Sequence, residues 1–275
     1  MWLLDFDGAI TLAEVEGIPY RLAAIEEVAK YINMGFEEAL ALAERFEAIV
    51  MAEPHKYPWR YNGLAVGPAS VDPYLRMVPV GIMLMNEAGV FKDDPAAQEN
   101  FMVHTIYPHN YKKTSIAFKP DAKDFLNSLD PTRTLVITNS STDAVINKIK
   151  TLGPQFAWLQ ACVIGNARKF EVIPNFTDIN QEEMWIPGLE RPILLRRQNY
   201  FMVISDLCDR FGITNWSDIT VLGDIFEFDG VLPLWNGCRF VHTVNQFTPP
   251  YEIDFLEGHR HGHVVRSLTE AINLI

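Results

Sequence analysis

The sequence predicts an α/β fold in which an open parallel sheet is interrupted by an inserted, all-helical domain. A short apolar run at Trp2–Leu4 is typical of a strand that is buried on both faces of a parallel sheet. From about residue 115 onward, strand-like and helix-like segments alternate, which also indicates a parallel sheet. Between them, residues 18–106 show helical spacing of apolar residues and several turn breaks. We therefore expect a core domain of residues 1–11 and 115–275 and a helical domain of residues 12–114.

Each remaining strand of the core is expected where a short apolar run ends in polar residues or glycine. The predicted strands after the first are Thr134–Thr138, Ala161–Gly165, Thr220–Asp224 and Arg239–Thr243. Longer segments between and after these strands have the pattern of helices that pack on a sheet. The predicted helices of the core are Asp121–Leu129, Asp143–Leu152, Gln198–Phe211 and Ser267–Ile275.

The helical domain is expected to begin with two long helices, Tyr20–Asn33 and Phe36–Met51, because their apolar residues recur at helical spacing. Asp72-Pro73 and Asp94-Pro95 each combine a capping aspartate with a proline in the first turn, so they mark the starts of two further helices. A loop rich in proline and glycine, Glu53–Val71, separates the two pairs of helices.

The composition is that of an ordinary globular protein, and it restricts the classes of function. A net charge of −12 argues against a nucleic-acid-binding surface, which would carry a basic patch. The three cysteines are widely spaced, which argues against a disulfide framework or a structural zinc site and favours a reducing compartment. No apolar run approaches the roughly 20 residues of a membrane span, and the N-terminus has no signal-peptide pattern. We therefore expect a cytoplasmic protein without a nucleic-acid or membrane partner.

Two carboxylates follow the first predicted strand. Asp5 and Asp7 are two residues apart, so in an extended chain their side chains point to the same side. Ligands bind at the carboxyl ends of strands in open α/β sheets, and Gly8 allows the backbone to turn away there. Close carboxylates require a cation or a shared proton, and Mg²⁺ is the hard, oxygen-binding cation that fits best. The alternative interpretation is that Asp-x-Asp-Gly only forms a turn after the strand.

A second polar segment follows the strand predicted at Thr134–Thr138. Thr138, Asn139 and Ser140 offer hydroxyl and amide groups beside the N-terminus of the next helix. Backbone N–H groups and the partial positive charge of a helix N-terminus favour an anion there. The segment therefore predicts a phosphate or carboxylate site, a simple helix cap, or both.

A third polar segment follows the strand predicted at Thr220–Asp224. Asp224 ends that strand, and Glu227 and Asp229 follow in an apolar setting that argues against a simple surface loop. Asp224 is expected to complete a metal site with Asp5. Glu227 or Asp229 is expected to support that site by contacting the metal ligands and not the metal itself.

These three strand ends, in this order, resemble the motifs of the haloacid dehalogenase-like (HAD) superfamily of phosphohydrolases. They are Asp-x-Asp-Gly at residues 5–8, Thr-Asn at residues 138–139 and Gly-Asp-x-x-x-x-Asp at residues 223–229. The resemblance covers the core and implies that its sheet is Rossmann-like. It also accounts for the helical insertion, because that superfamily often places a helical cap domain after its first motif.

The resemblance implies a role for each matched residue. Asp5 is the expected nucleophile, which forms a phosphoaspartate, and Asp7 is the expected general acid and base. Thr138 is expected to bind the transferring phosphoryl group, with Asn139 beside it. Mg²⁺ would be held by Asp5, Asp224 and the backbone carbonyl of Asp7.

The resemblance also implies a lysine between the second and the last of these motifs. Lys169 matches best, because it comes just after a predicted strand. Arg168 is its neighbour and its competitor. Lys148 and Lys150 are rivals, but they lie in the helix that follows Thr138, where a lysine is usually only solvated. We predict that Lys169 is the catalytic lysine.

The function that the resemblance implies is a Mg²⁺-dependent phosphohydrolase, which cleaves a small phosphorylated metabolite through a phosphoaspartate. A 2-haloacid dehalogenase is an alternative on the same fold, although those relatives lack the second acid of the first motif, which is Asp7 here. A phosphomutase shares the core motifs and is another alternative. A non-catalytic scaffold on a decayed enzyme core belongs to a different class, but the matched residues are all present.

The loop Glu53–Val71 is unusually aromatic, with Trp59 and two tyrosines around Arg60. Aromatic and arginine side chains in a polar loop are typical of recognition surfaces. We therefore expect Arg60 and Trp59 to contribute to substrate binding. The alternative is that the aromatic residues pack the helical domain against itself.

Overall fold

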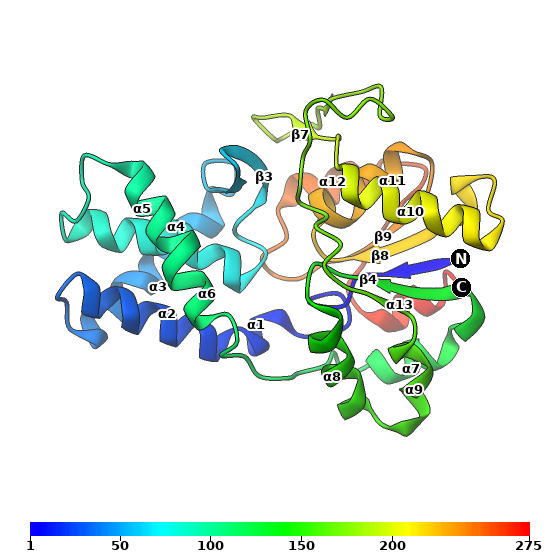
Figure 1. The fold of residues 1–275 in the computed structure, drawn as a ribbon, viewed down its shortest axis with the longest axis horizontal. Helices are drawn as coiled ribbons and strands as arrows, with labels where there is room; N and C mark the ends of the chain where they lie inside the picture. Colours follow the sequence, from blue (N-terminus) through cyan, green and yellow to red (C-terminus); the bar gives the residue numbers. More distant parts are fainter. The chain divides into compact units, whose positions relative to one another are not determined.

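The computed structural model describes residues Met1–Ile275. The chain forms two compact units, which are described separately (Figure 1). The sheet unit consists of Met1–Leu12, Arg60–Gly67 and Phe118–Ile275. The helical unit consists of Ala13–Trp59 and Pro68–Ala117.

The sheet unit is built on a six-stranded sheet with the strand order β10-β9-β8-β1-β4-β5. Its strands are β1 (Trp2–Leu4), β4 (Thr134–Ile137), β5 (Val163–Ile164), β8 (Thr220–Gly223), β9 (Arg239–Thr243) and β10 (Gly262–Val265). All neighbouring strands are parallel. In the centre of the sheet, Leu4 of β1 is level with Val136 of β4 and Leu222 of β8. The predicted α/β fold with a Rossmann-like parallel sheet is therefore confirmed.

Helices cover both faces of this sheet. Leu3 packs in the same core cluster as residues of α10, α11 and α12, whereas Leu4 packs with residues of α7, α8 and α13. Successive strand residues point to opposite faces, so a strand of apolar residues is buried by both layers of helices. Figure 1 shows the same two layers, with α10, α11 and α12 on one side of the strands and α7, α8, α9 and α13 on the other.

The helices of the sheet unit are α7 (Ala122–Ser128), α8 (Thr142–Leu152), α9 (Ala157–Gln160), α10 (Gln198–Phe211), α11 (Val231–Trp235), α12 (Pro250–Glu257) and α13 (Leu268–Ile272). Single turns of other helix types are η2 (Pro131–Arg133), η3 (Pro154–Phe156), η4 (Trp216–Asp218) and η5 (Phe226–Gly230). A separate two-stranded sheet joins β6 (Glu183–Met184) and β7 (Ile193–Leu194).

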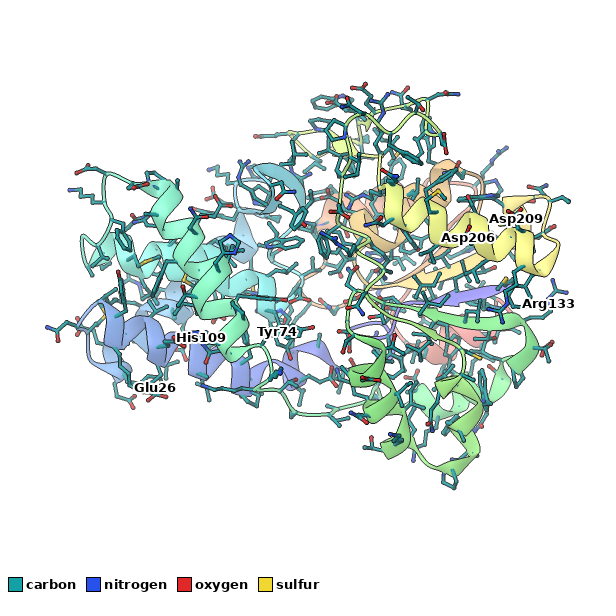
Figure 2. All side chains as sticks on the ribbon, viewed as in Figure 1. Glu26, Tyr74, His109, Arg133, Asp206 and Asp209 are labelled. Carbon is teal, nitrogen blue, oxygen red and sulfur yellow. The ribbon has the colours of Figure 1, made fainter.

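α10 illustrates how the sequence pattern positions a covering helix. Ile204 and Leu207 are buried in the core that this helix shares with the sheet. Asp206 and Asp209 are on its exposed side and are labelled in Figure 2. Gly212, at a φ of 65°, ends the helix in the left-handed conformation that glycine tolerates. The observed bounds agree with the predicted helix.

Two elements near the C-terminus were not predicted, namely α12 and β10. β10 is the edge strand of the sheet and pairs only with β9. It follows a short segment with one glycine and two histidines, and His263 interrupts its own apolar run. The polar residues of an edge strand weaken the apolar pattern on which the prediction depends.

The helical unit has its own core. Its elements are α1 (Ala13–Glu16), α2 (Ile18–Tyr31), α3 (Phe36–Ala52), α4 (Pro73–Glu87), α5 (Pro95–Phe101), η1 (Met102–Ile106) and α6 (Tyr107–Asn110). Apolar residues of α2, α3, α4 and η1 form one buried cluster. The two predicted caps are confirmed, because Asp72 accepts hydrogen bonds from the first turn of α4 and Asp94 from that of α5. No helix in the chain has both the length and the apolar character required to cross a membrane.

The prediction of a continuous loop at Glu53–Val71 is wrong in part. Two short strands, β2 (Pro58–Tyr61) and β3 (Leu64–Pro68), pair with each other. Asn62 and Gly63 join them with φ values of 50° and 78°. An Asn-Gly pair with positive φ at both positions is the preferred two-residue hairpin turn, so this signal was available in the sequence.

Candidate active site

Three candidate residues directly follow three adjacent strands. Asp5 follows β1, Thr138 follows β4 and Asp224 follows β8. The backbone N–H of Asp5 donates to the carbonyl of Leu222 at 2.7 Å, which continues the strand ladder into the site. Because β8, β1 and β4 are parallel neighbours, their carboxyl ends lie on one edge of the sheet. The structure thus brings together the strand ends that the sequence singled out.

Carboxylate oxygens of Asp5, Asp224 and Asp229 lie within 4.8 Å of one another. These three side chains are almost completely buried, with exposed fractions of 8%, 3% and 2%. Buried carboxylates at this separation repel one another strongly unless positive charge lies among them. The cluster therefore depends on nearby cations.

Lys169 supplies one of those cations. Its Nζ is 2.5 Å from Oδ1 of Asp5 and 2.5 Å from Oδ1 of Asp229, and it also donates to the carbonyl of Ile137 at 3.0 Å. The side chain is only 1% exposed. All three protons of the ammonium group therefore have an acceptor, which a buried lysine requires.

The electrostatics of the pair follow from burial and from these partners. Burial raises the pKa of Asp5 to about 8, against the opposing effect of the Lys169 ammonium, and Asp229 raises it further. Burial alone would lower the pKa of Lys169, but the charges of Asp229 and Asp5 raise it above its usual value. Lys169 thus stays charged, and additional positive charge beside Asp5 would favour the ionised, nucleophilic form of that carboxyl group.

The donor set fits a hard divalent cation. Asp229 is already satisfied, because its Oδ1 accepts from Lys169 and its Oδ2 accepts from the backbone N–H of Ile225 at 3.1 Å. Asp5 and Asp224 are the other two carboxylates of the cluster, and oxygen ligands of this kind suit Mg²⁺. Asp229 instead accepts a hydrogen bond from Lys169 and so helps to hold the ammonium group in place.

The conformation and surroundings of Gly8 explain why the Asp-x-Asp-Gly motif has a glycine at this position. Its φ is +83°, and a Cβ placed on it would lie 2.0 Å from Oδ2 of Asp224. The Asp224 carboxylate therefore packs directly against the backbone that follows Asp7. A side chain at this position would displace the carboxylate and strain the backbone.

We expect Gly8→Ala to weaken Mg²⁺ binding, because the new methyl group must push Asp224 away from Asp5. The left-handed backbone adds about 1 kcal/mol of destabilisation. Isothermal titration with Mg²⁺ and urea unfolding measure the two effects. Gly212→Ala is the matched control, since Gly212 also has a positive φ but has open space around it. Equal Mg²⁺ affinity in the two variants would contradict the role given to Gly8.

Asp7 is paired with a lysine that was expected to be only solvated. Nζ of Lys148 is 2.6 Å from Oδ1 of Asp7, and the side chain of Lys148 is only 13% exposed. Lys150, by contrast, is exposed and donates to Asn147 on the same helix. The expectation of a solvated side chain is therefore correct for Lys150 and wrong for Lys148.

The residues that follow β4 make different hydrogen bonds. Thr138 is buried, and its hydroxyl accepts the backbone N–H of Ser140 at 3.0 Å. The side-chain oxygen of Asn139 accepts the backbone N–H of Lys169 at 2.7 Å. Asn139 thus connects the end of β4 to the loop that follows β5 and carries Lys169, which we call the lysine loop. The cap of α8 is Ser141, which accepts from Ala144, and not one of the three residues expected to bind the anion.

The loop after β5 turns Lys169 inward and its competitor outward. Arg168 has a φ of 47° and is 48% exposed, and it pairs with Glu171 at 2.8 Å. Positive φ is uncommon for a residue other than glycine, and in this turn it is Lys169, not Arg168, that reaches Asp5. Lys169 is the lysine that the structure places against Asp5.

Glu227 takes part in a different buried pair. It is completely buried, and Arg191 donates to its two carboxylate oxygens at 2.9 and 2.6 Å. Of the two acids expected to support the site, Asp229 therefore contacts Lys169, whereas Glu227 fixes the η5 turn through Arg191. Arg191 comes from an irregular segment, where no periodicity could have indicated it.

The hairpin segment Arg60–Gly67 contacts the lysine loop, although Arg60 itself does not. Arg60 is exposed and donates to the carbonyl of Gly63 at 3.1 Å. Tyr61 instead accepts a hydrogen bond from Arg168 at 2.6 Å and packs edge-on against Phe170. Trp59 belongs to the helical unit. The structure therefore does not place Arg60 at the carboxylates.

Arg197 connects the lysine loop to the hairpin. It is fully buried, and it donates to the carbonyl of Lys169 at 2.9 Å and to that of Val66 at 2.8 Å. Burial lowers its pKa to about 10. Arg197 therefore joins the hairpin to the lysine loop from the interior of the sheet unit.

Comparisons with known proteins find matches among solved structures. No protein-family model and no curated protein matches the chain. A predicted phosphoglycolate phosphatase from Haemophilus somnus 129pt is 13% identical, with a TM-score of 0.50 over 100% of this chain and 96% of that chain. A HAD phosphatase from Thermococcus onnurineus is 14% identical, with a TM-score of 0.47 over 99% and 96% of the two chains. L-2-haloacid dehalogenase from Xanthobacter autotrophicus is 12% identical, with a TM-score of 0.40 over 99% and 96%.

Proposed function

We propose that this chain, which has the fold of the haloacid dehalogenase-like superfamily, is a Mg²⁺-dependent phosphohydrolase that cleaves a small phosphorylated metabolite. The observation that supports this most is the position of Lys169 between Asp5 and Asp229. A buried carboxylate is held there by a fixed ammonium group, beside Asp224, at the ligand-binding edge of the sheet. Such a site combines a nucleophile with positive charge for a phosphoryl group.

The first half of the proposed reaction transfers the phosphoryl group to Asp5. A carboxylate oxygen of Asp5 attacks phosphorus, and the bond between phosphorus and the ester oxygen breaks. The electron pair leaves with that oxygen, which takes a proton from the carboxyl group of Asp7. Lys169 occupies Oδ1 of Asp5, so the attack falls to the other oxygen.

The second half hydrolyses the phosphoaspartate. The Asp7 carboxylate takes a proton from water while the water oxygen attacks phosphorus, and the bond between phosphorus and Asp5 breaks. Inorganic phosphate leaves, Asp5 is again a carboxylate, and Asp7 carries the proton for the next cycle. Asp5, Asp224 and the backbone carbonyl of Asp7 would hold Mg²⁺, which neutralises charge on the phosphoryl group when it is bound. Lys169 and Thr138 stabilise the remaining oxygens.

Asp7 favours this reaction over dehalogenation. Cleavage of a carbon–halogen bond releases a halide, which needs no proton. In such a reaction Asp7, which Lys148 holds in place, would have no role as a general acid. In the proposed enzyme the helical unit acts as a cap, which excludes water and selects the substrate. The exposed Arg60, on the hairpin, is proposed to contact acidic groups of that substrate.

We expect phosphate release from 4-nitrophenyl phosphate and from some members of a panel of phosphorylated metabolites. The release should stop in EDTA and return on addition of excess Mg²⁺, because the carboxylates of the site need a divalent cation. Chloride release from a 2-haloacid without phosphate release would favour a dehalogenase instead. Absence of both reactions, with no Mg²⁺ binding in isothermal titration at millimolar concentration, would favour the non-catalytic scaffold.

A further inference from the structure

The two lysines of α8 have different surroundings. Lys148 reaches Oδ1 of Asp7 at 2.6 Å, whereas Lys150 is exposed and donates to Asn147 at 3.3 Å. The Lys148 side chain is 13% exposed and the Asp7 side chain 28%. A lysine that is placed only for solubility would extend into solvent, as Lys150 does. The direction of Lys148 therefore calls for a specific explanation.

The helix determines this direction. Val145, Ile149 and Leu152 form the buried stripe of α8. Lys148 lies three residues after Val145, so it is on the edge of that stripe and not on the opposite, exposed face. α8 also begins four residues after Thr138, which follows β4, the strand that pairs with β1. The sequence thus anchors Lys148 on a rigid element beside the site.

The Asp7 carboxylate is held on one side only. Oδ1 is paired with Lys148, whereas Oδ2 is buried and has no hydrogen-bond partner in the protein. A buried polar atom without a partner costs free energy, and a ligand that pairs with it removes that cost. Oδ2 is therefore the oxygen that is available to a ligand.

We propose that Lys148 is a positioning residue, which holds Oδ1 of Asp7 so that Oδ2 faces the leaving-group oxygen of the substrate. This inference rests on the proposed phosphohydrolase function. The proton moves from Oδ2 of Asp7 to the leaving oxygen, and Lys148 keeps its own protons. Proton transfer requires close and well-aligned donor and acceptor atoms, so a carboxylate fixed at one oxygen transfers efficiently from the other.

The test compares a poor leaving group with a good one. Hydrolysis of an alkyl phosphate needs protonation of the departing alkoxide, whereas 4-nitrophenolate departs without it. For Lys148→Met we expect the single-turnover rate of alcohol release from the alkyl ester to fall about tenfold to a hundredfold, part of what general acid catalysis contributes. Single-turnover release of 4-nitrophenolate, which precedes the hydrolysis step in which Asp7 acts as a base, should slow less than about threefold, and KM should change little for either ester. Lys148→Arg should recover part of the lost rate.

Lys150→Met is the matched control, because it removes a lysine from the same helix without touching Asp7, and it should leave both esters unaffected. An equal loss on the two esters would overturn the inference, since a general structural defect lowers both. A raised KM with unchanged kcat would also overturn it, because Lys148 would then bind substrate and not position Asp7.

A second measurement does not depend on activity. Urea unfolding of Lys148→Met, Asp7→Asn and the double variant should give shifts of the midpoint that are not additive, because the two side chains are in contact. Additive shifts would overturn the pairing itself. A wild-type protein that hydrolyses neither ester would refute the proposed function, and the unfolding measurement would then decide alone whether Lys148 holds Asp7.

Discussion

Asp5→Asn is expected to lower kcat for phosphate release by on the order of 10⁴-fold or more, as loss of a covalent nucleophile does in other hydrolases. Asparagine keeps the size of the side chain but is a very weak nucleophile toward phosphorus. Lys169 retains Asp229 as a partner at 2.5 Å, so the variant keeps an ion pair in the buried site. We therefore expect a folded protein that lacks activity.

Phosphate release is measured under excess Mg²⁺, and circular dichroism confirms the fold. Asp5→Ala controls for slow deamidation of the new asparagine, which would restore aspartate and a trace of activity. Acid quenching of the wild-type protein during turnover should leave one phosphoryl group on the peptide that contains Asp5, detectable by mass spectrometry. Full activity of both folded variants would show that another residue attacks phosphorus.

The parts of the site that the sequence predicted are those determined by strands. Asp5, Thr138 and Asp224 each end a short apolar run, and parallel pairing of those runs brings the three residues together. No knowledge of side-chain direction was needed, because the edge of a parallel sheet is the same for every strand. For these residues, finding the strands was enough to place the candidate residues at one edge of the sheet.

The parts that the sequence did not predict come from irregular segments. Arg191 and Arg197 flank β7, where there is no periodicity. Arg197 is buried against carbonyl groups, and the partly buried Arg191 pairs with the Glu227 carboxylate. Lys148 was misjudged for a different reason, since its helix was predicted but its rotation relative to Asp7 depends on tertiary packing. The hairpin around Asn62-Gly63 was missed even though that dipeptide carries a turn signal.

Lys169→Met is expected to reduce the free energy of unfolding by about 3–5 kcal/mol, the usual cost of removing one partner from a buried ion pair. Lys169 is 1% exposed, so solvent screens its charge very little. Without it, Asp5 and Asp229 remain buried with no neutralising ammonium between them. Urea unfolding measures the loss, and Lys150→Met, which removes an exposed lysine, should change the free energy of unfolding by less than about 0.5 kcal/mol.

A double variant separates loss of charge balance from loss of packing. Lys169→Met combined with Asp229→Asn removes one of the two uncompensated carboxylates, so it should be more stable than Lys169→Met alone. If methionine lowered the free energy of unfolding only because of its shape, the second substitution would lower it further. A double variant less stable than the single one would therefore contradict the electrostatic account.

Mg²⁺ should stabilise Lys169→Met more than it stabilises the wild-type protein. A ligand that binds only the folded state raises the free energy of unfolding in proportion to the logarithm of its concentration relative to its dissociation constant. In the wild-type protein the Lys169 ammonium opposes a second cation beside Asp5, whereas in the variant that repulsion is gone and the carboxylates attract Mg²⁺ more strongly. Unfolding curves at several Mg²⁺ concentrations measure the difference. An equal Mg²⁺ effect on the two proteins would mean that the metal lies too far from Asp5 to share its charge with Lys169.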